Sequence, residues 1–157
     1  MESFKEVKFS VQMKTMYMFD FLYWHSYHGV TGIINYALSF AGIAALIAGF
    51  GKGNAMVTVM LVALASLFTV INPLSLLYKA ARQVKKSPMF AKPLYYKFDT
   101  RGFSISQDNT SDSAEWNAVV FVRETGKSII LYLGAANALI LPKKDIGEQL
   151  PDLKKLI

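Results

Sequence analysis

The residue types that could perform chemistry are few in this chain and lie far apart. The two histidines, His25 and His28, stand three residues apart, so on a helix they would face one way and could share a metal ion. The nearest acid, Asp20, lies a turn or more away, so we favour two polar aromatics at the level of lipid headgroups. The other acids are scattered over turns and strand edges, where solvation explains them: Asp99, Asp108, Asp112, Glu115 and Glu124.

The rest of the chemical inventory also argues against catalysis. The chain has no cysteine, which excludes disulfides and thiolate chemistry. No glycine-rich phosphate loop follows a strand, and no nucleophile stands beside an acid–base pair. We therefore predict a protein that is not an enzyme and that uses no metal and no cofactor.

The segment Pro142-Lys143-Lys144 is the sharpest candidate for a binding site. It ends an apolar run and opens a new apolar rhythm, so we expect Pro142 in the first turn of a helix. Free backbone N–H groups there, together with Lys143 and Lys144, would suit a phosphate or a carboxylate. A solvated first turn is the favoured alternative, because lysines oppose the helix dipole at that end.

Two long uncharged segments decide the class of protein. Residues 30–50 and 55–78 carry no charged side chain, and about 20 apolar residues suffice to cross a bilayer. Only residues 51–54 join them, which predicts an antiparallel transmembrane hairpin. Two buried helices of a soluble core are the disfavoured alternative, because the remaining residues could not cover them on all sides.

The basic residues predict the orientation of this hairpin and a ligand. The tip has only Lys52, whereas lysines precede the first span and many basic residues follow the second, so both termini are expected in the cytoplasm. The helix should continue to about residue 86, and a juxtamembrane basic residue attracts an anionic leaflet by about 1 kcal/mol. We therefore predict that anionic lipid, and not nucleic acid, is bound by the cluster beside the span: Lys79, Arg82, Lys85 and Lys86.

The spans themselves show no path for ions, because neither holds an ionisable residue. Asn35 and Asn72 suit hydrogen bonds between helices, and Pro73 is expected to kink the second span. Small residues of the first span permit close packing within the hairpin or between copies, which leaves a homo-oligomer open: Gly32, Gly42, Ala45 and Gly49.

The regions on either side of residues 30–86 read differently from the spans. In residues 1–29, a strand of alternating apolar and polar residues at 7–13 precedes a helix rich in aromatic residues, which suits either the membrane interface or a core. Residues 94–157 read as short strands, with a polar stretch at 110–116, followed by a closing helix interrupted at Pro151.

These patterns resemble the YcxB-like family of bacterial membrane proteins over nearly the whole chain. The shared motifs are a Tyr-x-Phe strand with a glycine turn, a tryptophan that opens a strand carrying a glutamate, and an apolar strand ending in Pro-Lys. The matching residues are Tyr96, Phe98, Gly102, Trp116, Glu124, Tyr132, Pro142 and Lys143. On its strand, Trp116 is expected in the core rather than in contact with a ligand.

The resemblance implies two spans followed by a small domain of pleckstrin-homology-like fold. The predicted fold class is thus an α+β membrane protein, a transmembrane hairpin with a cytoplasmic β-sandwich or barrel closed by a C-terminal helix. Such a domain needs seven strands, and residues 94–157 supply about six. We therefore predict that the strand at 7–13 joins the C-terminal sheet.

The predicted function is a non-catalytic binding module anchored at the inner leaflet of a bacterial cell membrane. It would bind a lipid headgroup or a protein partner that the sequence does not identify. A role in bacteriocin self-immunity or envelope stress is a variant that rests on analogy alone. The alternative is an accessory subunit of a transport or secretion complex, with the spans as its contact surface.

Overall fold

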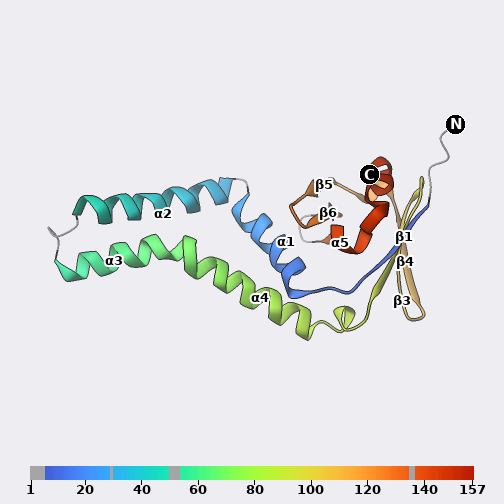
Figure 1. Cartoon of the computed structure of the whole chain (residues 1–157), viewed down its shortest axis with the longest axis horizontal. Coiled ribbons are helices and arrows are strands. Elements are labelled where there is room, and N and C mark those ends of the chain that lie inside the picture. Colours follow the sequence, from blue (N-terminus) through green and yellow to red (C-terminus); the bar gives the residue numbers. More distant parts are fainter. Residues whose placement is uncertain (1–5, 29, 50–53, 135–136) are drawn as a thin grey trace. The chain divides into compact units, whose positions relative to one another are not determined.

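The computed structural model describes residues 6–28, 30–49, 54–134 and 137–157, and it divides into two units. The sheet unit comprises the chain up to Phe21 and from Ala81 onwards, and it holds every strand of the described residues. The helix unit comprises Leu22–Ala80. The chain therefore begins in the sheet unit, leaves it for the helix unit and then returns to it (Figure 1).

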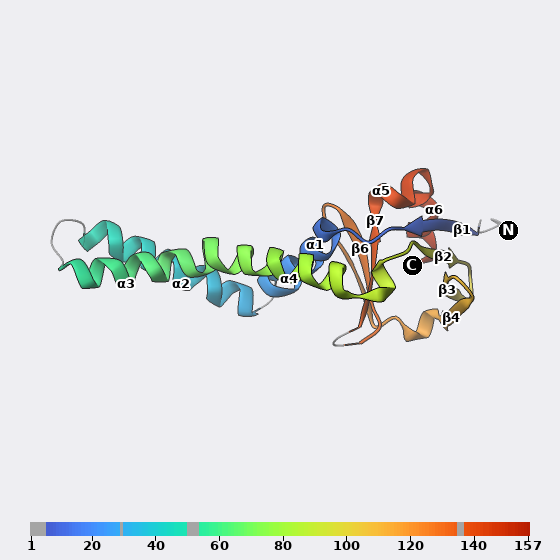
Figure 2. The ribbon, with the colours of Figure 1, turned by 90° about the horizontal axis from the view of Figure 1, so that it is seen from below.

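Two helices are long and apolar enough to cross a membrane, and most of their residues lie in the helix unit. Helix α2 (Val30–Gly49) is the first, and the second runs without a break through α3 (Ala55–Ser66), the π-helical η1 (Leu67–Ile71) and α4 (Asn72–Lys86). Helices α2 and α3 lie side by side (Figures 1 and 2). The predicted tip at residues 51–53 lies outside the described residues.

The close approach of α2 and α3 depends on one of the predicted small residues, Gly42. A Cβ atom added at Gly42 would lie 3.0 Å from the backbone nitrogen of Ala65 and 3.2 Å from its Cα. Glycine therefore lets α3 come nearer to α2 than any other residue would, as small residues do between apolar helices. The other glycine near that end of α2, Gly49, has open space around it.

The π-helical turn η1 lies directly before Asn72-Pro73, where the sequence predicts a kink. Proline has no N–H to donate, so regular α-helical bonding cannot continue through this point. The carbonyl of Phe68 accepts a hydrogen bond from the hydroxyl of Tyr27, and the amide of Asn72 donates to the same hydroxyl at 3.1 Å. Asn72 thus bonds to another helix, as predicted, and its partner lies in α1 (Thr15–Tyr27).

The sheet unit is built from two antiparallel sheets. The first has the order β1-β2-β3-β4, formed by Val7–Val11, Leu94–Phe98, Gly102–Gln107 and Thr110–Glu115. The second has the order β5-β6-β7, formed by Phe121–Glu124, Ser128–Tyr132 and Ala138–Pro142. Within the described ranges no strand pairing joins the two sheets, so the barrel form of the prediction is wrong and the two-sheet form holds.

The N-terminal strand joins the C-terminal sheet, which confirms the sequence prediction, although β1 ends two residues early. Val7 pairs with Phe98 and Val11 pairs with Leu94 in an antiparallel register. The other edge of β1 is covered by one side chain. The Gln149 amide accepts a hydrogen bond from the Lys8 N–H at 2.9 Å and donates one to the Lys8 carbonyl at 3.0 Å. It thereby occupies two of the backbone groups that a further strand would need.

The core of the sheet unit consists of the apolar residues that alternate along β1 and β2 and fill β6 and β7. Phe98, Leu131 and Leu141 are fully buried, and Leu153 from α6 (Leu150–Leu156) closes the core. Burial of the Tyr96 phenol raises its pKa to about 12. This packing explains why the closing helix is part of the fold, since its apolar face completes the core.

Strand β4 was not expected, because residues 110–116 were interpreted as a polar stretch. Its side chains are nearly all exposed, so the period-two pattern of a half-buried strand is missing. Backbone pairing forms the strand instead, from Gln107↔Thr110 to Gly102↔Glu115. A Cβ at Gly102 would lie 2.1 Å from the Ala114 carbonyl oxygen, so this close approach requires the glycine of the predicted motif.

The predicted closing helix needs two corrections. Pro142 is not in its first turn: it is the last residue of β7, paired with Ser128, and α5 begins at Lys143 and ends at Ile146. The interruption is not at Pro151, which lies in the first turn of α6, where helices tolerate proline. It is at the short η4 turn (Gly147–Gln149), because Gly147 has a φ of 61° and ends α5.

Candidate functional site

The first candidate region is the end of α4, which carries the four basic residues predicted from the sequence. Leu76 and Ala80 are buried on one side of this helix, whereas every one of the cations is exposed. Within the described part of the chain, no acid pairs with any of them: Lys79, Arg82, Lys85 and Lys86. The helix is continuous with the apolar α3, so an apolar segment passes directly into a cationic one. Four unpaired cations on such a helix can bind a surface of opposite charge.

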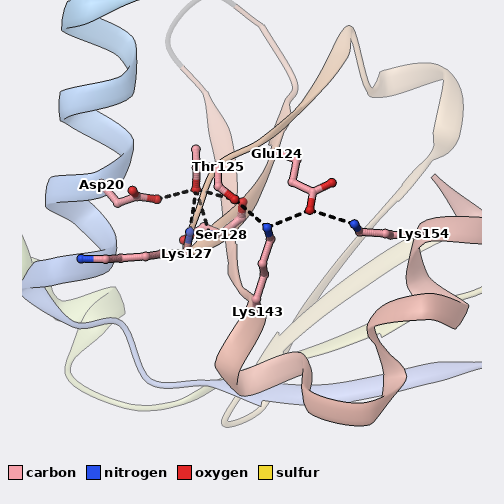
Figure 3. Close-up of polar contacts among 7 residues, drawn as sticks. All are labelled: Asp20, Glu124, Thr125, Lys127, Ser128, Lys143 and Lys154. Carbon is pink, nitrogen blue, oxygen red and sulfur yellow. Dashed lines mark hydrogen bonds and ion pairs between the residues drawn. The ribbon is translucent and has the colours of Figure 1, made fainter.

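Lys143, from the second candidate region, is fully engaged within the sheet unit. Its ammonium donates a hydrogen bond to the Thr125 carbonyl at 2.6 Å and forms an ion pair with Glu124 Oε1 at 2.7 Å (Figure 3). Its backbone N–H donates to the Lys127 carbonyl at 2.9 Å. Lys144 is exposed and takes no part in these bonds. The two lysines therefore do not converge on one spot, and α5, with four residues, offers no helix terminus for an anion.

Glu124 is the acidic centre of this cluster. Lys154 from α6 reaches the same carboxylate oxygen at 2.8 Å. Hydrogen bonds from Lys143 and Lys154 lower the pKa of Glu124 to about 2. The carboxylate stays ionised between two ammonium groups. The two ion pairs of Glu124 link β5 to α5 and α6. Because the three side chains are partly exposed to solvent, these ion pairs contribute little to the free energy of folding.

The Thr125 hydroxyl continues the network towards the N-terminal segment. It lies 2.6 Å from Asp20 Oδ2 in α1, to which it can donate, and it accepts from the Ser128 N–H at 2.9 Å. The Thr125 N–H in turn donates to the Ser128 carbonyl at 2.8 Å, which closes the turn between β5 and β6. One buried hydroxyl thus holds a tight turn and α1 together, as Figure 3 shows. We call the residues drawn there the lysine–threonine network: Asp20, Glu124, Thr125, Lys127, Ser128, Lys143 and Lys154.

Asp145 lies beside this network, and its pKa is shifted in the opposite direction to the pKa of Glu124. Burial raises its pKa, against the nearby positive charges of Lys14 and Lys144 and a hydrogen bond with the Tyr17 hydroxyl. Its Oδ2 atom is buried without a hydrogen-bond partner among the described residues. The contact joins α5 to α1, and the carboxyl group is more easily protonated here than in water.

The tryptophan of the predicted motif is part of the core, as expected, but it is not on a strand. Trp116 begins the short turn η3 (Trp116–Ala118), and its indole N–H donates a hydrogen bond to the Asp99 carbonyl at 2.9 Å. Its ring packs against Phe98 and Phe103, each at a centroid distance of 6.0 Å. The indole and its polar edge are both satisfied inside the protein, which leaves a structural role.

His25 lies in the last turn of α1, and His28 follows the end of this helix. His28 stacks on the Trp24 ring, and its Nδ1 lies 3.1 Å from the Trp24 carbonyl. Among the residues that the structure describes, no set of three histidine, cysteine, aspartate or glutamate side chains could hold a metal ion.

Five members of the lysine–threonine network are not among the residues that the sequence singles out for a motif or a site: Asp20, Thr125, Lys127, Ser128 and Lys154. From the sequence, Asp20 is only the acid nearest to the histidines. A threonine two or three residues before the N–H groups it accepts from is a known turn motif, so Thr125 had a local signal. The partners Asp20 and Lys154 lie far along the chain and had none.

The comparisons with known proteins agree with the motifs. No curated protein and no solved structure matched the chain. One family model, described as "YcxB-like protein", matches residues 98–157, which run from the end of β2 to the last residue. The spans lie outside that match. Over residues 98–157, the chain is similar to the YcxB-like family.

Proposed function

We propose that this protein is a membrane-anchored, non-catalytic binding module that engages anionic lipid through the end of α4. The observation that carries the proposal is the unbroken helix from Ala55 to Lys86, which is apolar along most of its length and then presents four exposed cations. In a bilayer, the apolar part would lie among the acyl chains. The cations would then stand at the headgroups, where a negative leaflet attracts them.

A pleckstrin-homology-like fold is part of this proposal. Seven strands in two antiparallel sheets, followed by a closing helix, support it, as does the return of β1 to the sheet. Under this proposal the sheet unit lies in the bacterial cytoplasm with both termini. It binds a partner or headgroup there while the helix pair holds it at the membrane.

The lipid preference of the full chain tests the proposal. In bilayers with a spin-labelled lipid, the wild type should immobilise phosphatidylglycerol more than phosphatidylcholine. Changing Lys85 and Lys86 together to glutamine should lower this preference about thirtyfold, at about 1 kcal/mol for each residue. The matched control removes two other exposed lysines, Lys127 and Lys155, and should keep the preference. The proposal would be overturned if the Lys85 and Lys86 double variant preferred phosphatidylglycerol as strongly as the Lys127 and Lys155 double variant does.

The orientation has its own test, which the absence of native cysteine makes clean. With Lys52→Cys, an impermeant maleimide should label intact cells from outside. With Ser111→Cys, labelling should require permeabilised cells. The opposite pattern would contradict the proposed orientation.

A subunit of a transport or secretion complex is a second candidate, supported by the exposed apolar side chains of the helix unit. Ile33, Phe40 and Ile47 on α2 are each about 70% exposed, so bilayer lipid or a protein partner must cover them. Purification in mild detergent separates the candidates, because a stoichiometric transporter partner would favour the complex. A lone protein that makes a sensitive strain resistant to a bacteriocin would instead favour the immunity variant.

A further inference from the structure

The sheet unit contains an apolar cavity that neither the basic cluster nor the lysine–threonine network uses. It has a volume of about 140 Å³ and lies between the N-terminal segment, the end of α4, the short turn η2 (Pro88–Phe90), β2 and β7. Three of the seven methionines line it: Met13, Met18 and Met89. The lining also includes Phe90 and Ala138.

The composition of the cavity suits an apolar ligand rather than water. A buried water needs two to four polar partners, and an apolar cavity of roughly 150 Å³ stays dry and binds a molecule the size of benzene. Gln83 and Tyr96 are the lining residues with polar side-chain ends. Methionine side chains are flexible and polarisable, so they adapt to ligands of slightly different shape. A short run of methylene groups would fill this space.

The rim of the cavity adds a charge requirement. Gln83 is exposed and Met89 is 50% exposed, so the cavity reaches the surface at these two residues. Lys86 follows Gln83 by three positions on α4 and therefore lies on the same face of the helix. It is exposed, and among the described residues no acid pairs with it. A ligand that enters here would meet an apolar interior, with the cation of Lys86 about one helical turn from Gln83.

We propose that this cavity binds the end of a single alkyl chain whose anionic headgroup lies at Lys86. A fatty acid has this chemistry, and so does an acyl chain of an anionic bilayer lipid. The inference rests on the proposed function only if the ligand is the acyl chain of a bilayer lipid. It assigns α4 a second task, because the same lysine that faces anionic lipid would select the ligand of the cavity.

The test uses the full chain, with methionine methyl groups labelled with ¹³C, in nanodiscs of uncharged phosphatidylcholine. Added dodecanoate should shift the methyl signals of Met13, Met18 and Met89 until they saturate. Met16 is the internal control, since it lies on α1 beside Met18 but is outside the cavity lining. Shifts that grow without saturation, and equally at Met16, would mean partition into the bilayer and would overturn the proposal.

Two variants separate the chain from the headgroup. Ala138→Phe should fill the cavity and abolish the shifts, and Met89→Glu, at an exposed position, provides a second block by opposing the anion at the rim. Lys86→Gln should weaken dodecanoate binding by up to about fivefold and leave the binding of uncharged dodecanol unchanged. Unchanged dodecanoate binding in both Ala138→Phe and Met89→Glu would overturn the site.

The source of the ligand is tested by changing the lipid alone. If nanodiscs with phosphatidylglycerol shift the same three methyl groups without added fatty acid, the bilayer lipid is the ligand. If only dodecanoate does so, the site takes the free acid. Failure of the cavity proposal can be told apart from failure of the proposed function. The preference for anionic lipid at α4 can be lost while saturable binding of dodecanol in the cavity persists.

Discussion

Lys143 and Lys86 carry the same ammonium group on the same flexible stem, yet their surroundings are opposite. The Lys143 side chain is 24% exposed and bonds to the Thr125 carbonyl and to Glu124. Lys86 is exposed, and the described residues offer it no acid. A lysine with partners inside the fold stabilises it, whereas one without them is available to an outside anion. The local partners of a lysine, and not its residue type or a neighbouring lysine, decide whether it stabilises the fold or stays available to an anion.

We expect the largest effect on stability from removing the buried Thr125 hydroxyl of the lysine–threonine network. Thr125→Val leaves the Ser128 N–H and the Asp20 carboxylate without their partner, and an unpaired buried polar group costs about 1–3 kcal/mol. We expect the melting temperature of the sheet unit to fall by several degrees in the full chain in mild detergent. Thr125→Ser keeps the hydroxyl and serves as the control. A valine variant that melts with the wild type would show that the network is not structural.

A smaller effect should distinguish the two adjacent lysines. Lys143→Gln removes a hydrogen bond to a buried carbonyl and one ion pair, so the free energy of unfolding should fall by about 1 kcal/mol. Lys144→Gln and Lys86→Gln should leave the melting temperature unchanged, because both side chains are exposed. If Lys144→Gln destabilises as much as Lys143→Gln, the distinction between paired and unpaired lysines fails.

The pH dependence of stability should give the smallest and most specific signal. The folded pKa of Glu124, about 2, lies below its ordinary value of 4.5, so its contribution is present above pH 4.5 and is lost as the pH falls towards 2. Glu124→Gln should therefore flatten the decline of the melting temperature in that range. Glu6 and Asp99, whose pKa values are also lowered, keep part of the slope. Asp145 has the opposite sign, since its raised pKa makes protonation stabilising.

Much of the fold could be predicted because its signals are local. Uncharged length predicted the helix pair, and alternation over residues 7–13 predicted β1. Strand β4 could not be predicted in this way, because both of its faces are exposed and only pairing with β3 forms it. The break at Gly147 was also missed, since proline is the stronger sequence signal and φ is not visible in a sequence.

The candidate site shows the same limit. Exposure of the α4 cations followed from helix periodicity and from the span before them. The position of the Lys143 side chain, on α5, depended on Glu124, which lies on β5. Pro-Lys-Lys therefore gave the right boundary, between β7 and α5, and the wrong geometry for an anion. A contact between side chains that lie far apart in the sequence has no local pattern that would predict it.

The pairing of β1 with β2 also sets an order of events during synthesis. The ribosome makes β1 first, then both long apolar helices, and only afterwards the strand that β1 needs. Closing so long a connection is slow, and the edge of β1 stays open meanwhile. The complete sheet therefore forms after the hairpin has emerged, so a ribosome that stalls within α3 leaves a nascent chain without this domain.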